Sequence, residues 1–349
     1  MREREYNMDY LRIFACFMVI FLHVAAQNWS SVDVTGKQWH VFNLYNSAVR
    51  SSVPLFLMLS GKLLLSHGDD FSMKKFFSKN IKKLLIVYLV WAFLYAVDTV
   101  GIAEILKGNY RNLIACVVGA KFHLWYLSTL ISIYLLLPLF MGLIKYQGGR
   151  YVPYACILFL IWGVGKEFLM LLFPENLYLK RIFKDFTYAL GNLSGYFLLG
   201  YALDKYKDRF AKIKTGYLAA ALAVIIMIAA KAGELAALAA GKPKSIFFGY
   251  LALPVCVEAI LIFSIFLRFP KKLNNPKAAR IIAKLSKYTL FVYLFHIFVM
   301  EHLNIWFHIN SLICDPWLSV PLYSVFLFAV CMAGAWIVEK IPIIGKWIM

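Results

Sequence analysis

Residues 10–24 read YLRIFACFMVIFLHV, a hydrophobic run interrupted near its start by Arg12 and near its end by His23. On an α-helix, an eleven-residue separation is about three full turns and about 16 Å of rise, so both side chains project from one face at different depths. Ionisable groups in a membrane usually face a protein interior or a wet cavity, because contact with lipid is costly. The stretch therefore predicts a transmembrane helix with one functional face.

The rest of the chain has the same hydrophobic character. Of its 349 residues, 62% are hydrophobic and 17% aromatic, and apolar runs of about 20 residues recur without a polar stretch long enough for a soluble domain. We therefore predict an all-α polytopic membrane protein that forms a single domain over residues 1–349. About ten transmembrane helices are expected, near residues 8–28, 46–65, 84–103, 123–144, 151–173, 186–203, 215–232, 246–267, 288–308 and 318–338.

The charges predict the orientation. There are 37 Lys and Arg against 18 Asp and Glu, a formal net charge of +19. With a cytoplasmic N-terminus, about 23 cations fall on the inside, about 9 outside and about 5 within spans. Both termini are thus expected on the cytoplasmic side of a bacterial plasma membrane. The preference of cations for cytoplasmic loops accounts for the positive net charge without a nucleic-acid partner. The six cysteines show no metal-ligand spacing, so no metal is expected.

Arg12 and His23 have two interpretations. In the first, Arg12 snorkels to the cytoplasmic headgroups while His23 bonds a neighbouring helix. In the second, the two residues mark the ends of a site that extends along the membrane normal. Asp9 lies one turn before Arg12 and can pair with it in either case.

The second predicted span, NSAVRSSVPLFLMLSGKLLL (residues 46–65), places Arg50 about one turn inside its outer end. A cation there could hold a substrate phosphate or stabilise an oxyanion, or it could reach the outer headgroups. We expect Pro54 and the Ser60–Gly61 pair to bend or open this helix.

Further polar residues occur within the hydrophobic runs. Lys62 lies near the inner end of its span and is expected to snorkel. Tyr126 lies just below the outer interface, where it is either a belt aromatic or a ligand contact. His296 and Glu258 lie deep in the membrane, where a hydrogen bond between helices and a chemical role are both open.

Five blocks in this order resemble the acyltransferase-3 family of integral membrane acyltransferases. The first carries an Arg followed after ten residues by a His, here Arg12 and His23. The closest resemblance is to the enterobacterial-common-antigen O-acetyltransferase branch. The blocks are DYLRIFACFMVIFLH, NSAVRSSVPLFLMLSG, FFSKNIKKLLIVYLVW, HLWYLSTLISIYLLLPL and LSKYTLFVYLFHIF.

The resemblance implies transfer of an acyl group, usually acetyl from cytoplasmic acetyl-CoA, to a hydroxyl of an envelope carbohydrate or related molecule. It implies that His23 is the catalytic base and that Arg12 supports the acyl-CoA site. The family carries an Arg-x-x-Arg motif in the basic loop that leads into its third helix. This motif aligns here with Asn80-x-x-Lys83, or after a one-residue slip with Lys79-x-x-Lys82. Lysine keeps the charge but loses the bidentate fork.

These considerations give the expected site. His23, Arg12 and Arg50 are assigned to catalysis. Acetyl-CoA and a hydroxylated acceptor are the expected partners, beside membrane lipid, and the oligomeric state is open. The acetyl-CoA contacts are Arg12, Lys79, Lys82 and Lys83, and the acceptor contacts are Arg50, Asn46, His123, Trp125, Tyr126 and His296.

Three alternatives stay open from the sequence. An acyl-histidine intermediate on His23 competes with direct transfer. A transporter or flippase of a lipid-linked saccharide would also place His and Arg along a substrate pathway. A binding or sensory module is the third alternative, but the chain has little soluble mass for an output domain.

Overall fold

A computed structural model of the protein describes residues 3–66, 71–173, 176 and 192–341, and all regular structure in these ranges is helical. The predicted all-α fold is therefore confirmed. The helices are α1 (Tyr6–Ala26), α2 (Lys37–Val49), α3 (Ser52–Leu65), α4 (Met73–Phe76), α5 (Lys82–Val100), α6 (Ile102–Leu106), α7 (Tyr110–Gly119), α8 (Trp125–Leu135), α9 (Leu137–Lys145), α10 (Val152–Phe159), α11 (Lys166–Leu172), α13 (Ser194–Lys205), α14 (Thr215–Ala240), α15 (Leu253–Phe266), α16 (Pro276–Phe307) and α17 (Pro316–Glu339). Short 3₁₀ or π turns are η1 (Phe77–Ile81), η2 (Phe122–Leu124), η3 (Tyr146–Gly149), η4 (Leu160–Gly165) and η5 (Lys207–Phe210).

Seven stretches of the described chain are long and apolar enough to cross a membrane, and an eighth arises if α7 and η2–α8, which meet at 44°, form one bent span. The predicted span 123–144 falls on the second arm of this pair and on α9. The predicted span 246–267 contains a regular helix only in α15, which is 14 residues long. The predicted span 186–203 begins outside the described residues, and α13 covers its end.

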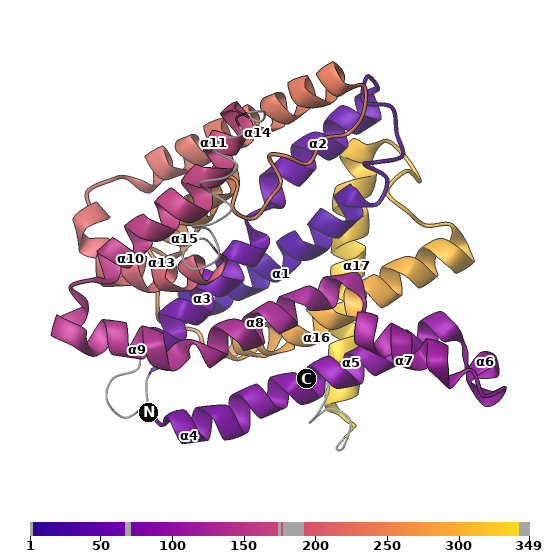
Figure 1. Ribbon diagram of the computed structural model, residues 1–349, viewed down its shortest axis with the longest axis horizontal. Coiled ribbons are helices and arrows are strands. Elements are labelled where there is room, and N and C mark those ends of the chain that lie inside the picture. The colour runs from indigo at the N-terminus through magenta and orange to yellow at the C-terminus, as the bar shows by residue number, and fades with distance from the viewer. Residues whose placement is uncertain (1–2, 67–70, 174–175, 177–191, 342–349) are drawn as a thin grey trace.

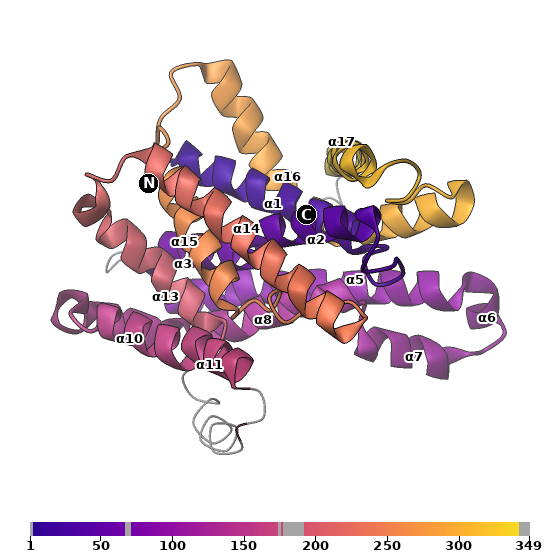
Figure 2. The ribbon, with the colours of Figure 1, turned by 90° about the horizontal axis from the view of Figure 1, so that it is seen from above.

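Helix α1 lies in the middle of the bundle (Figures 1 and 2). It packs against α2, α3, α15, α16 and α17. A helix that is apolar on most faces is stable only when other helices surround it or when it meets lipid. Its central place brings the Arg12–His23 face against other helices rather than against lipid.

The second predicted span is longer than expected and is broken. It begins at Lys37, and the break between α2 and α3 falls at Arg50 and Ser51. The cause is Pro54, because it lacks an N–H for the Arg50 carbonyl four residues earlier and its ring crowds that carbonyl. Pro54 therefore interrupts the helix one turn before its own position, and the interruption falls at Arg50.

The expected opening at Ser60–Gly61 is wrong. Gly61 lies inside the regular helix α3, and a Cβ atom on it would come within 1.8 Å of the Phe197 carbonyl oxygen of α13. A Cβ on Gly200 would come within 2.0 Å of the Met58 carbonyl oxygen. Small residues permit this close backbone approach in membrane bundles, so the two glycines fasten α3 to α13.

Lys62 does not snorkel as expected. Its side chain is 0% exposed and its Nζ lies 2.5 Å from Glu5 Oε2 and 3.6 Å from Asp204 Oδ2. Lysine is rarely buried without partners of opposite charge, and here the two carboxylates supply them. The ammonium ties the start of α1 to α3 and α13.

The segment between α14 and α15 departs from the predicted helix 246–267. Figure 1 shows the chain turning back from the end of α14 towards the centre of the molecule before α15 begins. Phe248 in this segment is buried, and its ring packs against Trp29 at a centroid distance of 5.6 Å. Irregular backbone inside a membrane bundle is tolerated where protein buries it.

Candidate active site

Three imidazoles from distant parts of the sequence meet beside α1. The ring centroids of His23 and His296 are 5.1 Å apart, and those of His123 and His296 are 5.7 Å apart. His296 comes from α16, which packs on α1. His123 follows a bend at Ala120, whose φ of +50° turns the chain from α7 into η2. The structure thus brings together three of the residues that the sequence singled out.

The hydrogen bonds of the two more deeply buried rings assign the tautomer that each neutral ring adopts. His296 Nδ1 lies 2.7 Å from the Tyr293 carbonyl oxygen, and His123 Nε2 lies 3.4 Å from the Leu294 carbonyl oxygen. Because a carbonyl only accepts, these nitrogens are the donors, and the other nitrogen of each neutral ring keeps its lone pair. His296 Nε2 and His123 Nδ1 are buried without a hydrogen-bond partner. The expected hydrogen bond from His296 to another helix is therefore replaced by one within α16.

These rings do not form a metal centre. Among the described residues, no group of three or more His, Cys, Asp or Glu side chains is placed to hold a metal ion.

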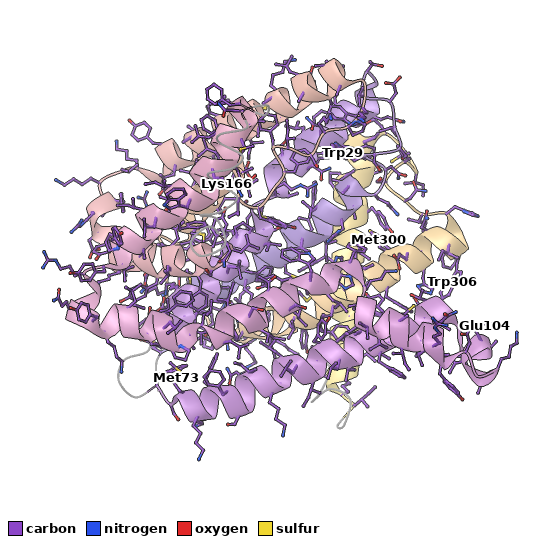
Figure 3. The ribbon with its side chains drawn as sticks, viewed as in Figure 1. Trp29, Met73, Glu104, Lys166, Met300 and Trp306 are labelled. Atoms are coloured by element: carbon purple, nitrogen blue, oxygen red, sulfur yellow. The ribbon has the colours of Figure 1, made fainter. Side chains whose placement is uncertain are left out.

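His23 borders a polar pocket of about 740 Å³ at the end of the bundle where α1 and α16 finish. Met300 and Trp306 of α16 lie at this end together with Trp29, which follows α1, whereas Met73 lies towards the other end (Figure 3). We call this pocket the His23 pocket. It is lined by His23, Ala26, Gln27, Asp98, Thr99, Lys121, Phe122, Met300, Glu301, His302, Asn304 and Ile305.

Charged residues that the sequence did not single out cross the His23 pocket in two pairs. Lys121 Nζ lies 2.8 Å from Glu301 Oε2, and His302 Nε2 lies 3.2 Å from Asp98 Oδ1. The pairs join α5 and the α7–α8 bend to α16. Their positions near the ends of apolar runs were visible in the sequence. The pairing of Lys121 with Glu301 depends on the bend, and the pairing of Asp98 with His302 depends on the packing of α5 beside α16.

Arg50 lies near His23 without an ion pair to any described residue. Its Nη2 donates to Asn46 Oδ1 at 2.8 Å, and its guanidinium lies 4.6 Å from the centroid of the Phe248 ring. The cation acts electrostatically on His23. Asn46, which was predicted as an acceptor contact, is fully buried and accepts this hydrogen bond from Arg50.

The two aromatic residues at the start of α8 lie in different environments. Trp125 is partly exposed and stacks on Tyr250 at 5.2 Å. Tyr126 is buried, and its ring lies 5.5 Å from the ring of Tyr293, which in turn contacts the rings of His123 and His296. Tyr126 therefore packs against Tyr293, next to the imidazole cluster, and does not lie at the surface of the bundle.

Arg12 lies at the other end of α1 in a smaller pocket of about 250 Å³, which we call the Arg12 pocket. Its side chain is 33% exposed and its Nη1 lies 3.3 Å from Ser286 Oγ. The expected contact with Asp9 is present at 3.9 Å, but Arg4 is the closer partner of Asp9 at 2.6 Å. The pocket is lined by Glu3, Arg4, Glu5, Met8, Asp9, Arg12 and Leu63.

The two pockets are separate. They share no lining residue. Cys16 and Val19, which lie on the α1 face between Arg12 and His23, are buried. Tyr126 and Tyr134 of α8 lie near Arg12. The site therefore consists of two pockets at opposite ends of α1.

The three lysines of the basic loop are not brought to Arg12. Lys79, Lys82 and Lys83 are exposed and do not line the Arg12 pocket. Lys79 lies in the π-helical turn η1 between α4 and α5, and Lys287 of α16 lies close enough to Lys83 for its like charge to act on it. The lysines form a separate basic surface.

Glu258 of α15 has neither of its carboxyl oxygens in a hydrogen bond, although it is fully buried. It faces Ser51 at the α2–α3 break, outside hydrogen-bonding geometry. The predicted hydrogen bond between helices is therefore not formed in this structure.

A comparison with known protein families matches residues 5–339 to a family described as an acyltransferase domain, the acyltransferase-3 family. No curated protein and no solved structure matches the chain. The matched range contains both pockets, all three clustered imidazoles and the α2–α3 break, except for Glu3 and Arg4 at the rim of the Arg12 pocket.

Proposed function

Because the chain belongs to the acyltransferase-3 family of membrane acyltransferases, we propose that it moves an acetyl group from cytoplasmic acetyl-CoA to a hydroxyl of an envelope carbohydrate or related acceptor in a bacterial plasma membrane. The observation that carries the proposal is the position of His23. Its imidazole borders a polar pocket on one side and contacts a second imidazole on the other.

The acceptor would occupy the His23 pocket. Carboxylates and amides such as Asp98, Glu301 and Gln27 line it, and these groups bind the hydroxyls of sugars by hydrogen bonds. The resemblance to the enterobacterial-common-antigen branch favours a polysaccharide of the cell envelope. Mass spectrometry of envelope glycans with and without the protein would identify the acceptor from the mass difference.

The reaction follows from the groups at His23. Neutral His23 takes the proton of the acceptor hydroxyl as its oxygen attacks the thioester carbonyl. The new C–O bond forms, the C–S bond breaks, and the proton passes from His23 to the departing CoA thiolate. Arg50, which lacks an ion pair with any described residue, would stabilise the oxyanion or hold the acceptor.

The donor would bind at the opposite end. Arg12 and the basic surface of Lys79, Lys82 and Lys83 carry charge that complements the nucleotide phosphates. The pantetheine arm has about 16 Å to cross between Arg12 and His23. In our proposal the arm passes along the α1 face that carries both residues, beside Tyr126 and Tyr134 of α8, which lie near Arg12.

Acyl transfer is tested with purified protein, radiolabelled acetyl-CoA and envelope glycan. Label on the glycan is the expected result. Movement of glycan across a vesicle membrane without label would favour a flippase instead. Ping-pong kinetics would favour an acyl-histidine intermediate, whereas an obligatory ternary complex would favour direct transfer.

Arg12→Ala is expected to raise the apparent KM for acetyl-CoA on the order of 10-fold or more, since it removes a charged hydrogen bond to the donor. The measurement is the initial rate against acetyl-CoA concentration at saturating acceptor. Arg111→Ala removes an exposed arginine of α7 and serves as the matched control. An unchanged dependence on acetyl-CoA in Arg12→Ala would contradict the assigned role.

A further inference from the structure

Nε2 of His296 is a buried polar atom without a hydrogen-bond partner in a ring that lies against His23. The His296 side chain is 0% exposed, its Nδ1 is committed to the Tyr293 carbonyl, and Nε2 has no partner. A buried nitrogen left in this state is destabilising, because its lost hydrogen bond to water is not replaced. Such an atom calls for an explanation, and the nearest group that can provide one is His23.

We propose that His296 is a positioning residue for His23, an inference that rests on the proposed function. When His23 takes the proton of the acceptor hydroxyl, both of its ring nitrogens carry hydrogen. One N–H faces the His23 pocket, and the other needs an acceptor in the protein. Nε2 of His296 supplies a lone pair for this second N–H, which orients the base and stabilises its charged form.

The distances permit this contact. Ring nitrogens lie about 1.2 Å from the centre of an imidazole, so a centroid separation of 5.1 Å allows an N–H···N contact near 3 Å after a small ring rotation. No hydrogen bond joins the two rings in the present structure. The contact would thus form as charge develops on His23.

The surroundings of His296 favour an imidazole in this role. His123 is the next ring behind it, and the Tyr293 hydroxyl donates to the main-chain carbonyl of His123. A carboxylate at this depth would add a buried anion, which is costly in a membrane. A neutral ring with a free lone pair provides an acceptor without that cost, and the Tyr293 carbonyl keeps it in the required tautomer.

Two substitutions separate positioning from packing. His296→Leu removes the lone pair, whereas His296→Gln keeps an acceptor oxygen in a side chain of similar reach. We expect His296→Leu to lower kcat on the order of 10- to 100-fold, with KM values for both substrates within about twofold. His296→Gln should recover a substantial part of kcat, and the pH profile of kcat should shift only in His296→Leu.

The control is His40→Leu in α2, a histidine outside the His23 pocket. All proteins are first compared by gel filtration in detergent. Wild-type kcat in His296→Leu, or equal losses in the Leu and Gln variants, would overturn the positioning role, as would a change confined to KM. If wild-type protein itself transfers no label, the proposed function fails, which is a distinguishable result.

Discussion

His23→Ala is expected to reduce acyl transfer by roughly 10²–10⁴-fold, the usual contribution of a positioned general base. His23 is the one member of the imidazole cluster that lines the His23 pocket, and the other imidazole of the pocket, His302, is paired with Asp98. The measurement is label transfer from acetyl-CoA to glycan. The protein should express and elute normally in detergent, because His23 forms no hydrogen bond or ion pair with a described residue whose loss would unfold it.

The control for this experiment is His40→Ala, which removes an imidazole from a different surface of α2. It should leave transfer unchanged. Acetylation retained at wild-type rate in His23→Ala would remove His23 from the mechanism. In the intact protein, acetyl label that is trapped on His23 before acceptor is added would instead assign it the nucleophile's role.

The arrangement of Arg12 and His23 was predictable because it is a local property of one helix. Eleven residues on a helix fix both the shared face and the separation in depth, and the structure places the residues in pockets at opposite ends of α1. The other residues that line the His23 pocket were not predictable. They come from α5, the α7–α8 bend and α16, whose positions relative to α1 follow from tertiary packing.

The contact between the three imidazoles could not be predicted from the sequence either. The sequence identified the three residues individually, with His23 and His296 as polar residues in apolar runs and His123 as an acceptor contact. Their contact requires the packing of α16 on α1 and the bend at Ala120, neither of which leaves a periodic signal. The ion pairs across the His23 pocket also depend on tertiary packing, so Asp98 and Glu301 were not singled out from the sequence.

The broken second span was partly predictable. Pro54 is a local signal with a fixed range, since it affects the carbonyl four residues before it. Gly61 was likewise expected to bend the helix. It instead permits close contact with Phe197 of α13. A glycine in a membrane helix marks either a bend or a close contact, and only the partner helix distinguishes the two.

Lys62→Met is expected to lower the free energy of unfolding by about 3 kcal/mol, the lower end of the range for breaking a buried ion pair. The substitution removes a fully buried ammonium from between Glu5 and Asp204. The estimate stays at the lower end because Lys271 remains 3.4 Å from Glu5 and Lys207 remains 3.3 Å from Asp204. The measurement is the midpoint of thermal unfolding in detergent.

Lys207→Met is the matched control, since its side chain belongs to the same network but is 40% exposed. A pair that exposed contributes about 0–1 kcal/mol, so its loss should shift the midpoint much less. Equal shifts in the two variants would contradict the assignment of Lys62 as the central cation. Replacing Lys62, Glu5 and Asp204 together by Met, Gln and Asn should recover most of the lost stability, because no uncompensated charge then stays buried.

The ion pairs of Lys62 with Glu5 and Asp204 connect stability to donor binding. Glu5 both accepts from Lys62 and lines the Arg12 pocket, so the start of α1 is held in place by the ammonium that α3 provides. Lys62→Met should therefore raise the apparent KM for acetyl-CoA at temperatures well below its unfolding midpoint, while the KM for the acceptor at the opposite end stays unchanged. A variant that loses stability but binds acetyl-CoA normally would show that the network supports the bundle without shaping the donor pocket.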